Sequence, residues 1–206
     1  MMSNNSDVLT ELAQMFPEPT AGELEHLAGR LAAEAERVGV LDVAYRVVDS
    51  PLGSLLVATT TEGLVRVAFE CEDHDAVLAS LASTISPRML QSSRRTDGVA
   101  RQLAEYFEGT RRAFDLPVDL RLVTGFRRDV ITQLRHITYG TTQSYATIAA
   151  AAGNPRAVRA VGSACAHNPV PVVVPCHRVI RSDGTIGQYL GGVEAKITLL
   201  ELEAAA

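Results

Sequence analysis

The sequence predicts an α/β N-terminal domain, in which helices pack on a small antiparallel sheet, followed by a mainly helical C-terminal domain that contains a helix-turn-helix. Two observations lead to this fold class. β-branched runs separated by turn signals fill residues 42–70, and helical periodicity dominates after residue 121. We divide the 206 residues into an appended helical segment (1–41), the α/β domain (42–120) and the helix-turn-helix domain (121–206).

The composition argues against several classes of protein. No segment reaches the roughly 18 to 20 continuous apolar residues of a membrane helix, and the first residues lack the pattern of a signal peptide, so we expect a cytoplasmic protein. The three cysteines, Cys71, Cys165 and Cys176, form no CxxC pair. We therefore expect reduced thiols and neither a disulfide framework nor a thiolate zinc cluster.

The formal net charge of −5 is divided unevenly along the chain. Residues 1–120 hold 10 Lys and Arg against 19 Asp and Glu, whereas residues 121–206 hold 9 against 5. Because electrostatic fields act over about a Debye length of ~8–10 Å, only the C-terminal part suits a phosphate backbone. Ordinary variation among solvated surfaces is the alternative explanation, so charge permits a nucleic-acid partner without requiring one.

Residues 1–41 predict two short helices. The first is indicated by apolar side chains at helical spacing before a Pro17–Pro19 turn: Val8, Leu9, Leu12, Met15 and Phe16. Thr20 and Glu23 form a capping-box signature for the second helix, whose apolar stripe is Leu24, Leu27, Leu31 and Val38. Such a stripe has to be buried, and we expect it to pack on the chain's own N-terminal domain rather than on another chain.

Residues 42–120 predict a three-stranded antiparallel meander with strands at Ala44–Val48, Leu55–Thr59 and Leu64–Phe69, followed by helices near 74–84 and 97–108. We find no catalytic pattern in this domain. Cys71 and His74 lie close in sequence, but without a second Cys or His pair they are more typical of a surface loop than of a metal site.

The C-terminal domain begins with a predicted helix at 125–137. Two further helices, Ser144–Ala152 and Arg156–His167, are joined by a tight Gly153-Asn154 turn, which indicates a helix-turn-helix, although helical hairpins are also common in protein cores. The second helix consists almost entirely of small residues around one long cation, Arg159. This composition allows close approach to a groove or a partner, or tight packing in the core.

An apolar, strand-like run from Pro169 ends in Cys176, His177 and Arg178. Two cations beside a thiol favour the thiolate over the free thiol, whose pKa is about 8.5. Cys176 is therefore a candidate nucleophile, and a buried structural cysteine is the alternative.

The string PCHRVI resembles the active-site motif of the 6-O-alkylguanine-DNA alkyltransferases, and the similarity continues in register from YGTTQSYATIAAAAGNPRAVRAVGSACAHNPVPVVV to GQYLGGVEAKITLLELE. The resemblance implies a helical DNA-binding and active-site domain after an α/β domain. It also implies DNA repair by irreversible transfer of a methyl or other alkyl group from the 6-oxygen of guanine in double-stranded DNA to Cys176. No cofactor or metal is implied, and we expect a monomer.

The resemblance also implies roles for individual residues. Cys176 matches the acceptor thiol, His177 the imidazole that takes its proton through a water, and Glu203 the carboxylate that orients the imidazole. Tyr145 matches the phenol that contacts the base and helps protonate the departing guanine. Arg159 matches the arginine that replaces the flipped nucleotide in the duplex.

The helix of Arg159 is expected in the minor groove. The further positions that match DNA contacts are Asn154, Ala157, Ala160, Gly162 and Ser182. Asn168 matches a hinge beside the active-site loop, and the other positions that match the guanine pocket are Pro171, Val179, Tyr189, Leu190 and Gly191. Leu190 stands where some relatives have a small polar residue, which leaves the pocket's tolerance of bulky alkyl groups open.

Three other functions compete with the transferase. A Cys-His hydrolase would use the same thiolate but leaves the helix-turn-helix with Arg159 unexplained. A helix-turn-helix regulator needs no reactive thiol. A non-catalytic protein that binds the alkylguanine lesion and signals to another repair pathway would lack the acceptor cysteine.

Overall fold

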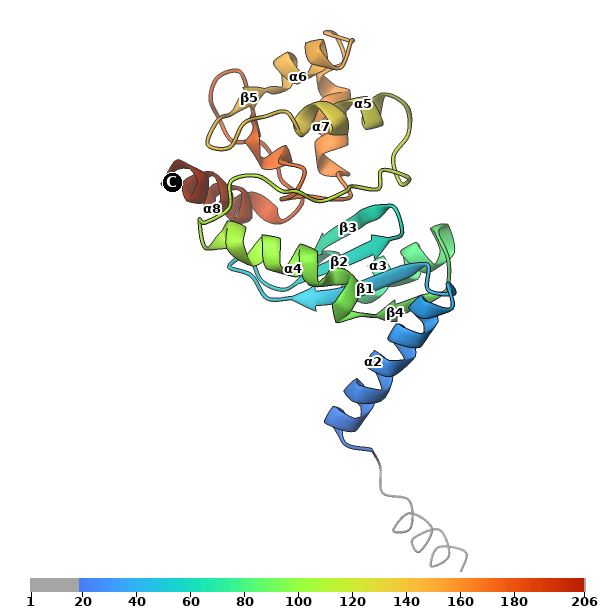
Figure 1. The fold of residues 1–206 in the computed structure, drawn as a ribbon. Helices are drawn as coiled ribbons and strands as arrows, with labels where there is room; N and C mark the ends of the chain where they lie inside the picture. The colour runs from blue at the N-terminus through green and yellow to red at the C-terminus, as the bar shows by residue number, and fades with distance from the viewer. Residues whose placement is uncertain (1–18, 206) are drawn as a thin grey trace, which may run out of the picture.

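The computed structural model describes residues 19–205 and places a helical C-terminal part over one face of an N-terminal sheet (Figure 1). Among these residues, no helix is long and apolar enough to cross a membrane. The N-terminal elements are α2 (Ala21–Arg37), β1 (Val43–Val48), β2 (Leu55–Thr60), β3 (Gly63–Phe69), the 3-10 turn η1 (Glu70–Glu72), α3 (His74–Thr84), β4 (Met89–Gln91) and α4 (Ser93–Phe107). The C-terminal elements are α5 (Gly125–Leu134), β5 (Gln143–Ser144), α6 (Tyr145–Ala151), α7 (Val158–Ala166), the 3-10 turn η2 (Cys176–Arg178), β6 (Val179–Ile180) and α8 (Gly192–Ala204).

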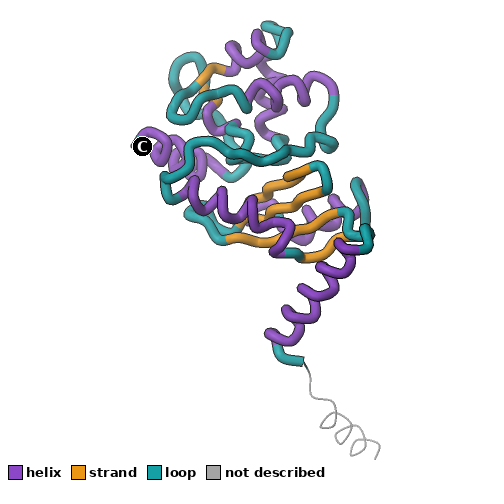
Figure 2. Tube along the Cα trace, viewed as in Figure 1, coloured by secondary structure: helices purple, strands orange, loops and turns teal. Residues whose placement is uncertain are grey.

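The sheet confirms the three predicted strands and adds a fourth. Its order is β3-β2-β1-β4 (Figure 1), with β2 antiparallel to both neighbours and β4 parallel to β1. Figure 2 shows the strands of this sheet in orange, below the C-terminal part. The expected purely antiparallel meander is therefore corrected to a small mixed sheet. Strand β4 has only three residues, too few to show the alternation by which strands are recognised in a sequence.

Both faces of the sheet are buried. Successive side chains of a strand point to opposite sides, so neighbouring residues of β2 belong to different cores. In β2, Leu56 and Ala58 pack with Val77 and Leu81 of α3. On the other face, Leu55 and Val57 join a core that includes residues of α4 and continues into α5, α6, α7 and α8. One apolar core therefore connects the sheet to the helical part that carries the candidate site.

Helix α2 begins with the predicted capping box, but its apolar stripe is not packed as we expected. Thr20 and Glu23 form the reciprocal capping box. The helix projects away from the edge of the sheet at β4 (Figure 1), and Leu24, Leu27 and Leu31 are exposed. The expected burial of this stripe on the chain's own domain is therefore wrong. The contact with the domain uses the small residues Ala32 and Ala35 instead, because only the end of the helix reaches the sheet.

The predicted first helix, with Val8 to Phe16, lies outside the described residues.

The C-terminal part contains the expected helix-turn-helix. Helices α6 and α7 contact each other and α5, and the turn between α6 and α7 contains Gly153 at φ 83°, a conformation that favours glycine. The short strands β5 and β6 pair in parallel, with Gln143 opposite Val179 and Ser144 opposite Ile180. Because α6 starts directly after β5 and η2 ends directly before β6, this pairing holds the first residue of α6 close to Cys176.

Candidate active site

The segment before Cys176 is a turn held by one buried amide, in place of the predicted strand-like run. Asn168 donates from Nδ2 to the Val174 carbonyl at 2.9 Å and to Cys176 Sγ at 3.1 Å, and its Oδ1 accepts from the Val170 amide at 3.0 Å. Prolines at 169, 171 and 175 have no amide hydrogen, so a regular strand ladder cannot form through this segment. Asn168 supplies the missing hydrogen bonds and thereby positions the thiol.

The N-terminal domain supports the same segment from outside. The Val67 amide of β3 donates to the Pro169 carbonyl at 2.8 Å. Val172, which lies in the turn, has φ 70°, a conformation that a β-branched residue adopts only when its surroundings impose it. The position of Cys176 therefore depends on contacts from both domains.

The Cys176 thiol is buried, with 2% of its surface exposed. Burial raises its pKa to about 11, although the Asn168 hydrogen bond and the positive charge of Lys196 act in the opposite direction. The sequence-based expectation that His177 and Arg178 would make this thiol ionise readily is therefore wrong. At neutral pH the resting group is a thiol, and a proton has to be removed before it can act as a nucleophile.

The two neighbouring side chains fail to ionise the thiol for separate reasons. The Arg178 guanidinium is directed at Glu203, with Nε 2.9 Å from Oε2 and Nη2 2.8 Å from Oε1. His177 is fully buried, and burial lowers the pKa of its imidazole, which keeps the ring neutral. Although His177 and Arg178 follow Cys176 in the sequence, neither of them places a positive charge at the sulfur.

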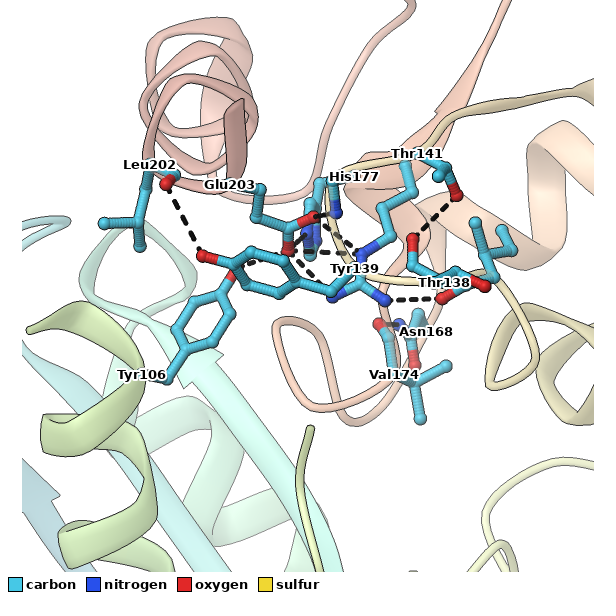
Figure 3. A network of polar contacts seen from close by, with 12 residues as sticks. Tyr106, Thr138, Tyr139, Thr141, Asn168, Val174, His177, Leu202 and Glu203 are labelled. Atoms are coloured by element: carbon cyan, nitrogen blue, oxygen red, sulfur yellow. Dashed lines mark hydrogen bonds and ion pairs between the residues drawn. The ribbon is translucent and has the colours of Figure 1, made fainter. Parts of the chain in front are cut away.

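Glu203 is the centre of a buried polar network (Figure 3). It accepts hydrogen bonds from His177 Nε2 at 2.8 Å, Tyr106 Oη at 2.7 Å and the Gly140 amide at 3.1 Å, in addition to Arg178. Burial alone would raise its pKa, but the hydrogen bonds from His177, Arg178 and Tyr106 outweigh burial and hold the pKa at about 2. Glu203 is therefore a carboxylate at neutral pH.

The charge of Glu203 determines the tautomer of His177. A carboxylate can only accept, so the Nε2 atom of the neutral ring carries the hydrogen and Nδ1 is unprotonated. Within the described chain, Nδ1 is buried and has no hydrogen-bond partner. The site thus contains a neutral thiol and, on the next residue of the chain, a buried imidazole nitrogen that can accept a proton.

Among the predicted pocket residues, Tyr189 lies against the buried network, with its ring edge-to-face with His177 at 6.3 Å between centroids. Pro171 and Val179 are buried, and Tyr189 and Leu190 are half-buried. The N-terminal domain also contacts Tyr189, because the Phe69 ring lies edge-to-face with it at 5.6 Å between centroids. A Cβ atom at Gly191 would lie 2.7 to 2.8 Å from the Phe69 ring, so this position has no room for a side chain.

Tyr145 is the first residue of α6 and is half-buried. A Cβ atom at Gly187 would come within 2.5 Å of its hydroxyl oxygen, so the absence of a side chain at Gly187 makes room for the phenol. Burial raises the pKa of Tyr145. The phenol therefore keeps its proton at neutral pH and can act as a donor.

The predicted DNA contacts lie at the surface of the C-terminal part, all of them in the helix-turn-helix except Ser182, which follows β6. Arg159, Ala160, Asn154 and Ser182 are exposed, and Ala157 and Gly162 are half-buried. The opposite side of α7, with Val161, Ala164 and Cys165, is buried in the core. Small residues thus occupy both the buried and the exposed face of α7, and Arg159 lies on the exposed face.

Sequence reasoning missed two buried residues of the site. Lys196 donates from Nζ to the Val179 carbonyl at 2.6 Å, and burial lowers its pKa. Its spacing from Leu199 and Glu203 places it on the buried face of α8, which was a usable signal. Tyr106 gives no comparable signal, because its contact with Glu203 crosses 97 positions of sequence.

Comparisons with known proteins show the family of this chain. Residues 43–120 match the family model described as 6-O-methylguanine DNA methyltransferase, ribonuclease-like domain, and residues 125–205 match the DNA binding domain of the same family. Several relatives carry the name methylated-DNA--protein-cysteine methyltransferase. The one from Mycolicibacterium paratuberculosis is 40% identical over 78% of this chain and 92% of its own, and the one from Methanosarcina barkeri is 36% identical over 77% and 96%.

Solved structures give the same result. The crystal structure of Mycobacterium tuberculosis OGT in complex with DNA matches with a TM-score of 0.68 and 38% identity, over 79% of this chain and 93% of that one. A structure from the archaeon Pyrococcus kodakaraensis, described as an O6-methylguanine-DNA methyltransferase, matches with a TM-score of 0.54 and 25% identity, over 78% and 98%. The similarity to named relatives extends over both domains, and the chain belongs to the 6-O-methylguanine DNA methyltransferase family.

Proposed function

We propose that this protein repairs alkylated DNA directly, by moving a methyl or other alkyl group from the 6-oxygen of guanine onto Cys176. The observation that carries the proposal is a buried thiol, held at 3.1 Å by Asn168, beside a neutral imidazole whose second nitrogen is bound to a carboxylate. The names of the relatives, which refer to methylated DNA and protein cysteine, support the same reaction.

The proposed reaction is a displacement at the alkyl carbon. His177 Nδ1 takes the proton of the Cys176 thiol through a water, and Glu203 stabilises the imidazolium that forms. The sulfur forms a bond to the alkyl carbon while the bond from that carbon to the 6-oxygen breaks, and its electrons pass to guanine. Tyr145 supplies a proton to the departing base. The product is a thioether, so each molecule acts once.

The alkyl carbon has to be brought to the buried thiol. A base inside the stack cannot reach a protein pocket, so the nucleotide is flipped out at a cost of a few kcal/mol. We propose that α7 lies in the minor groove, where Ala157, Ala160 and Gly162 allow close approach, and that Arg159 fills the space left by the base. Asn154 and Ser182 are exposed near this surface and would contact the DNA backbone.

The flipped guanine would enter the pocket beside Asn168, lined by Pro171, Val179, Tyr189, Leu190 and Gly191. In this scheme residues 121–206 bind DNA and carry the reaction, and residues 42–120 support the site. A DNA substrate and the reduced thiols expected from the sequence together favour the cytoplasm.

The proposal is tested by mixing the protein with a duplex that contains 6-O-methylguanine. We expect the intact mass to increase by one methyl group, and peptide mapping to place the group on Cys176. An unmodified duplex is the control. Methylation of Cys71 or Cys165 instead, or an unchanged mass, would exclude the proposed reaction.

Arg159→Ala tests the flipping role. We expect this change to slow transfer from duplex DNA much more than transfer from free benzylguanine, since the free base does not have to be extruded. The measurement is the pair of rate constants, with Arg101→Ala as a control because Arg101 is an exposed arginine of α4. Equal slowing with both substrates would show that Arg159 contributes to folding rather than to flipping.

A further inference from the structure

Tyr106 brings a hydroxyl group from the N-terminal domain into the buried network. It lies on α4, its side chain is fully buried, and its oxygen is 2.7 Å from Glu203 Oε1. The same carboxylate oxygen accepts the hydrogen bond from His177 Nε2 at 2.8 Å, and Figure 3 shows Tyr106 and His177 approaching Glu203 together. Tyr106 therefore binds directly to the carboxylate oxygen that orients the imidazole.

The ring of Tyr106 is fixed by aromatic neighbours. Phe107, Phe114 and Tyr139 have ring centroids 5.4, 5.2 and 6.1 Å away. A ring held in this way loses little further freedom when its hydroxyl makes a hydrogen bond. The Tyr106 hydroxyl can accordingly hold the Glu203 carboxylate in one position.

The direction of the hydrogen bond follows from the charges. Burial, followed by the negative charge of Glu203, raises the pKa of Tyr106 far above its ordinary value. Glu203, in contrast, remains ionised. A neutral phenol beside a carboxylate can only donate, so Tyr106 withdraws electron density from Oε1 whatever the pH near neutrality.

We propose that Tyr106 is a positioning residue for alkyl transfer, which holds Glu203 Oε1 toward His177 and limits how strongly that oxygen favours the protonated imidazole. This role rests on the proposed function. It also gives the N-terminal domain a part in the reaction through one hydrogen bond, beyond its packing against the helical domain.

Several other groups act on the charge of His177. Arg178 from η2 and Lys196 from α8 are positive and disfavour the imidazolium, whereas Glu203 favours it. Tyr189 faces the imidazole edge-to-face at 6.3 Å between centroids, and Cys176 precedes it in the chain. Tyr106 acts on this set only through Glu203, so its removal should change the balance at His177 without removing any formal charge.

The test is the pH dependence of transfer by Tyr106→Phe, which keeps the ring and removes the donor. With one donor fewer, Oε1 becomes a stronger partner for the imidazolium, and His177 becomes protonated at a higher pH. We expect a rate about three- to tenfold below the unsubstituted protein at pH 6, a loss of the size that one hydrogen bond produces, and a smaller reduction at pH 8.5. An equal reduction of the rate at both pH values would overturn the proposal, because it would show that the Tyr106 hydroxyl only stabilises the fold.

Tyr139→Phe is the matched control. Its ring belongs to the same aromatic cluster, but its hydroxyl is 3.4 Å from the Leu202 carbonyl and makes no bond to Glu203. We expect an unchanged pH profile for this variant. A displaced profile in Tyr139→Phe of the same size as in Tyr106→Phe would assign the effect to the cluster and overturn the role of the Tyr106 hydroxyl.

A second variant changes the strength of the hydrogen bond in the opposite direction and keeps the shape of the tyrosine side chain. Replacing Tyr106 with 3-fluorotyrosine makes the phenol a stronger donor, so the acid limb of the rate profile should move to lower pH. Movement to higher pH, or none, would contradict the proposal. This variant also serves if Tyr106→Phe does not fold.

NMR titration of His177, one of five histidines, separates this proposal from the proposed function. We expect protonation of His177 at a higher pH in Tyr106→Phe than in the unsubstituted protein. This shift can be measured even if the unsubstituted protein transfers no alkyl group, an outcome that would sink the proposed function alone. Identical titration curves for the two proteins would sink the role of Tyr106.

Discussion

Cys176→Ser is expected to abolish alkyl transfer to the protein. A serine hydroxyl keeps the hydrogen bond that Asn168 donates to Cys176 Sγ at 3.1 Å, so the loop should be retained. The hydroxyl is a far weaker nucleophile than a thiolate, and the site offers no stronger base than His177 to activate it. The measurement is intact mass after prolonged incubation with a duplex that contains 6-O-methylguanine.

The same variant should still bind the duplex with an affinity within a few-fold of the unsubstituted protein. The proposed DNA contacts are exposed or half-buried residues at the surface of the C-terminal part, whereas Cys176 is 2% exposed. A loss of both transfer and binding would mean that the substitution had disturbed the fold. Cys165→Ser, which changes a second buried cysteine on the core side of α7, tests whether the effect is specific to Cys176 and should preserve transfer.

Glu203→Gln is expected to have the largest effect on stability. The amide keeps the size of the side chain but leaves the buried Arg178 guanidinium without its anionic partner. Removing one member of a buried ion pair typically lowers the free energy of unfolding by about 3 to 5 kcal/mol. Thermal unfolding should show a decrease in Tm of roughly 10 °C. Transfer should fall as well, because the His177 imidazolium loses its stabilising charge.

Glu201→Gln is the matched control. It makes the same chemical change two residues away on α8, where the side chain is exposed, and should shift Tm by no more than about one or two degrees. A stable Glu203→Gln protein with normal transfer would show that Glu203 is dispensable for the proposed mechanism. A large loss of stability in Glu201→Gln would assign the effect to the helix rather than to the buried network.

The sequence predicted elements wherever a local pattern is strong. The strands at 55–60 and 63–69 alternate between two buried faces, and the helix at 74–84 was predicted with its observed bounds. β4 was missed because it pairs in parallel with a strand more than forty residues earlier, and three residues carry no periodicity. Thr20 marked the start of α2, but whether Leu27 is buried depends on the direction in which the helix leaves the sheet.

The candidate site was predictable in its chemistry and less so in its electrostatics. The PCHRVI motif pointed to Cys176 and His177, and the resemblance in the last helix pointed to Glu203. The structure joins His177 and Glu203 by a hydrogen bond of 2.8 Å. The motif also suggested that Arg178 acts on the sulfur, whereas the guanidinium pairs with Glu203. Neighbours in sequence do not reveal which way a long side chain turns. Tyr106 could not be found without the fold, because only the packing of α4 brings it to α8.

The burial of Cys176 bears on chemoselectivity. A protein whose acceptor group is consumed in one event is inactivated by any other electrophile that reaches that group first. Small alkylating agents and oxidants react with thiolates, and a sheltered thiol with a pKa of about 11 presents almost none at neutral pH. Cys71, which is exposed, is the more accessible target for such reagents. Under the proposed function, the raised pKa and the burial of Cys176 would protect the acceptor until a bound substrate makes proton removal productive.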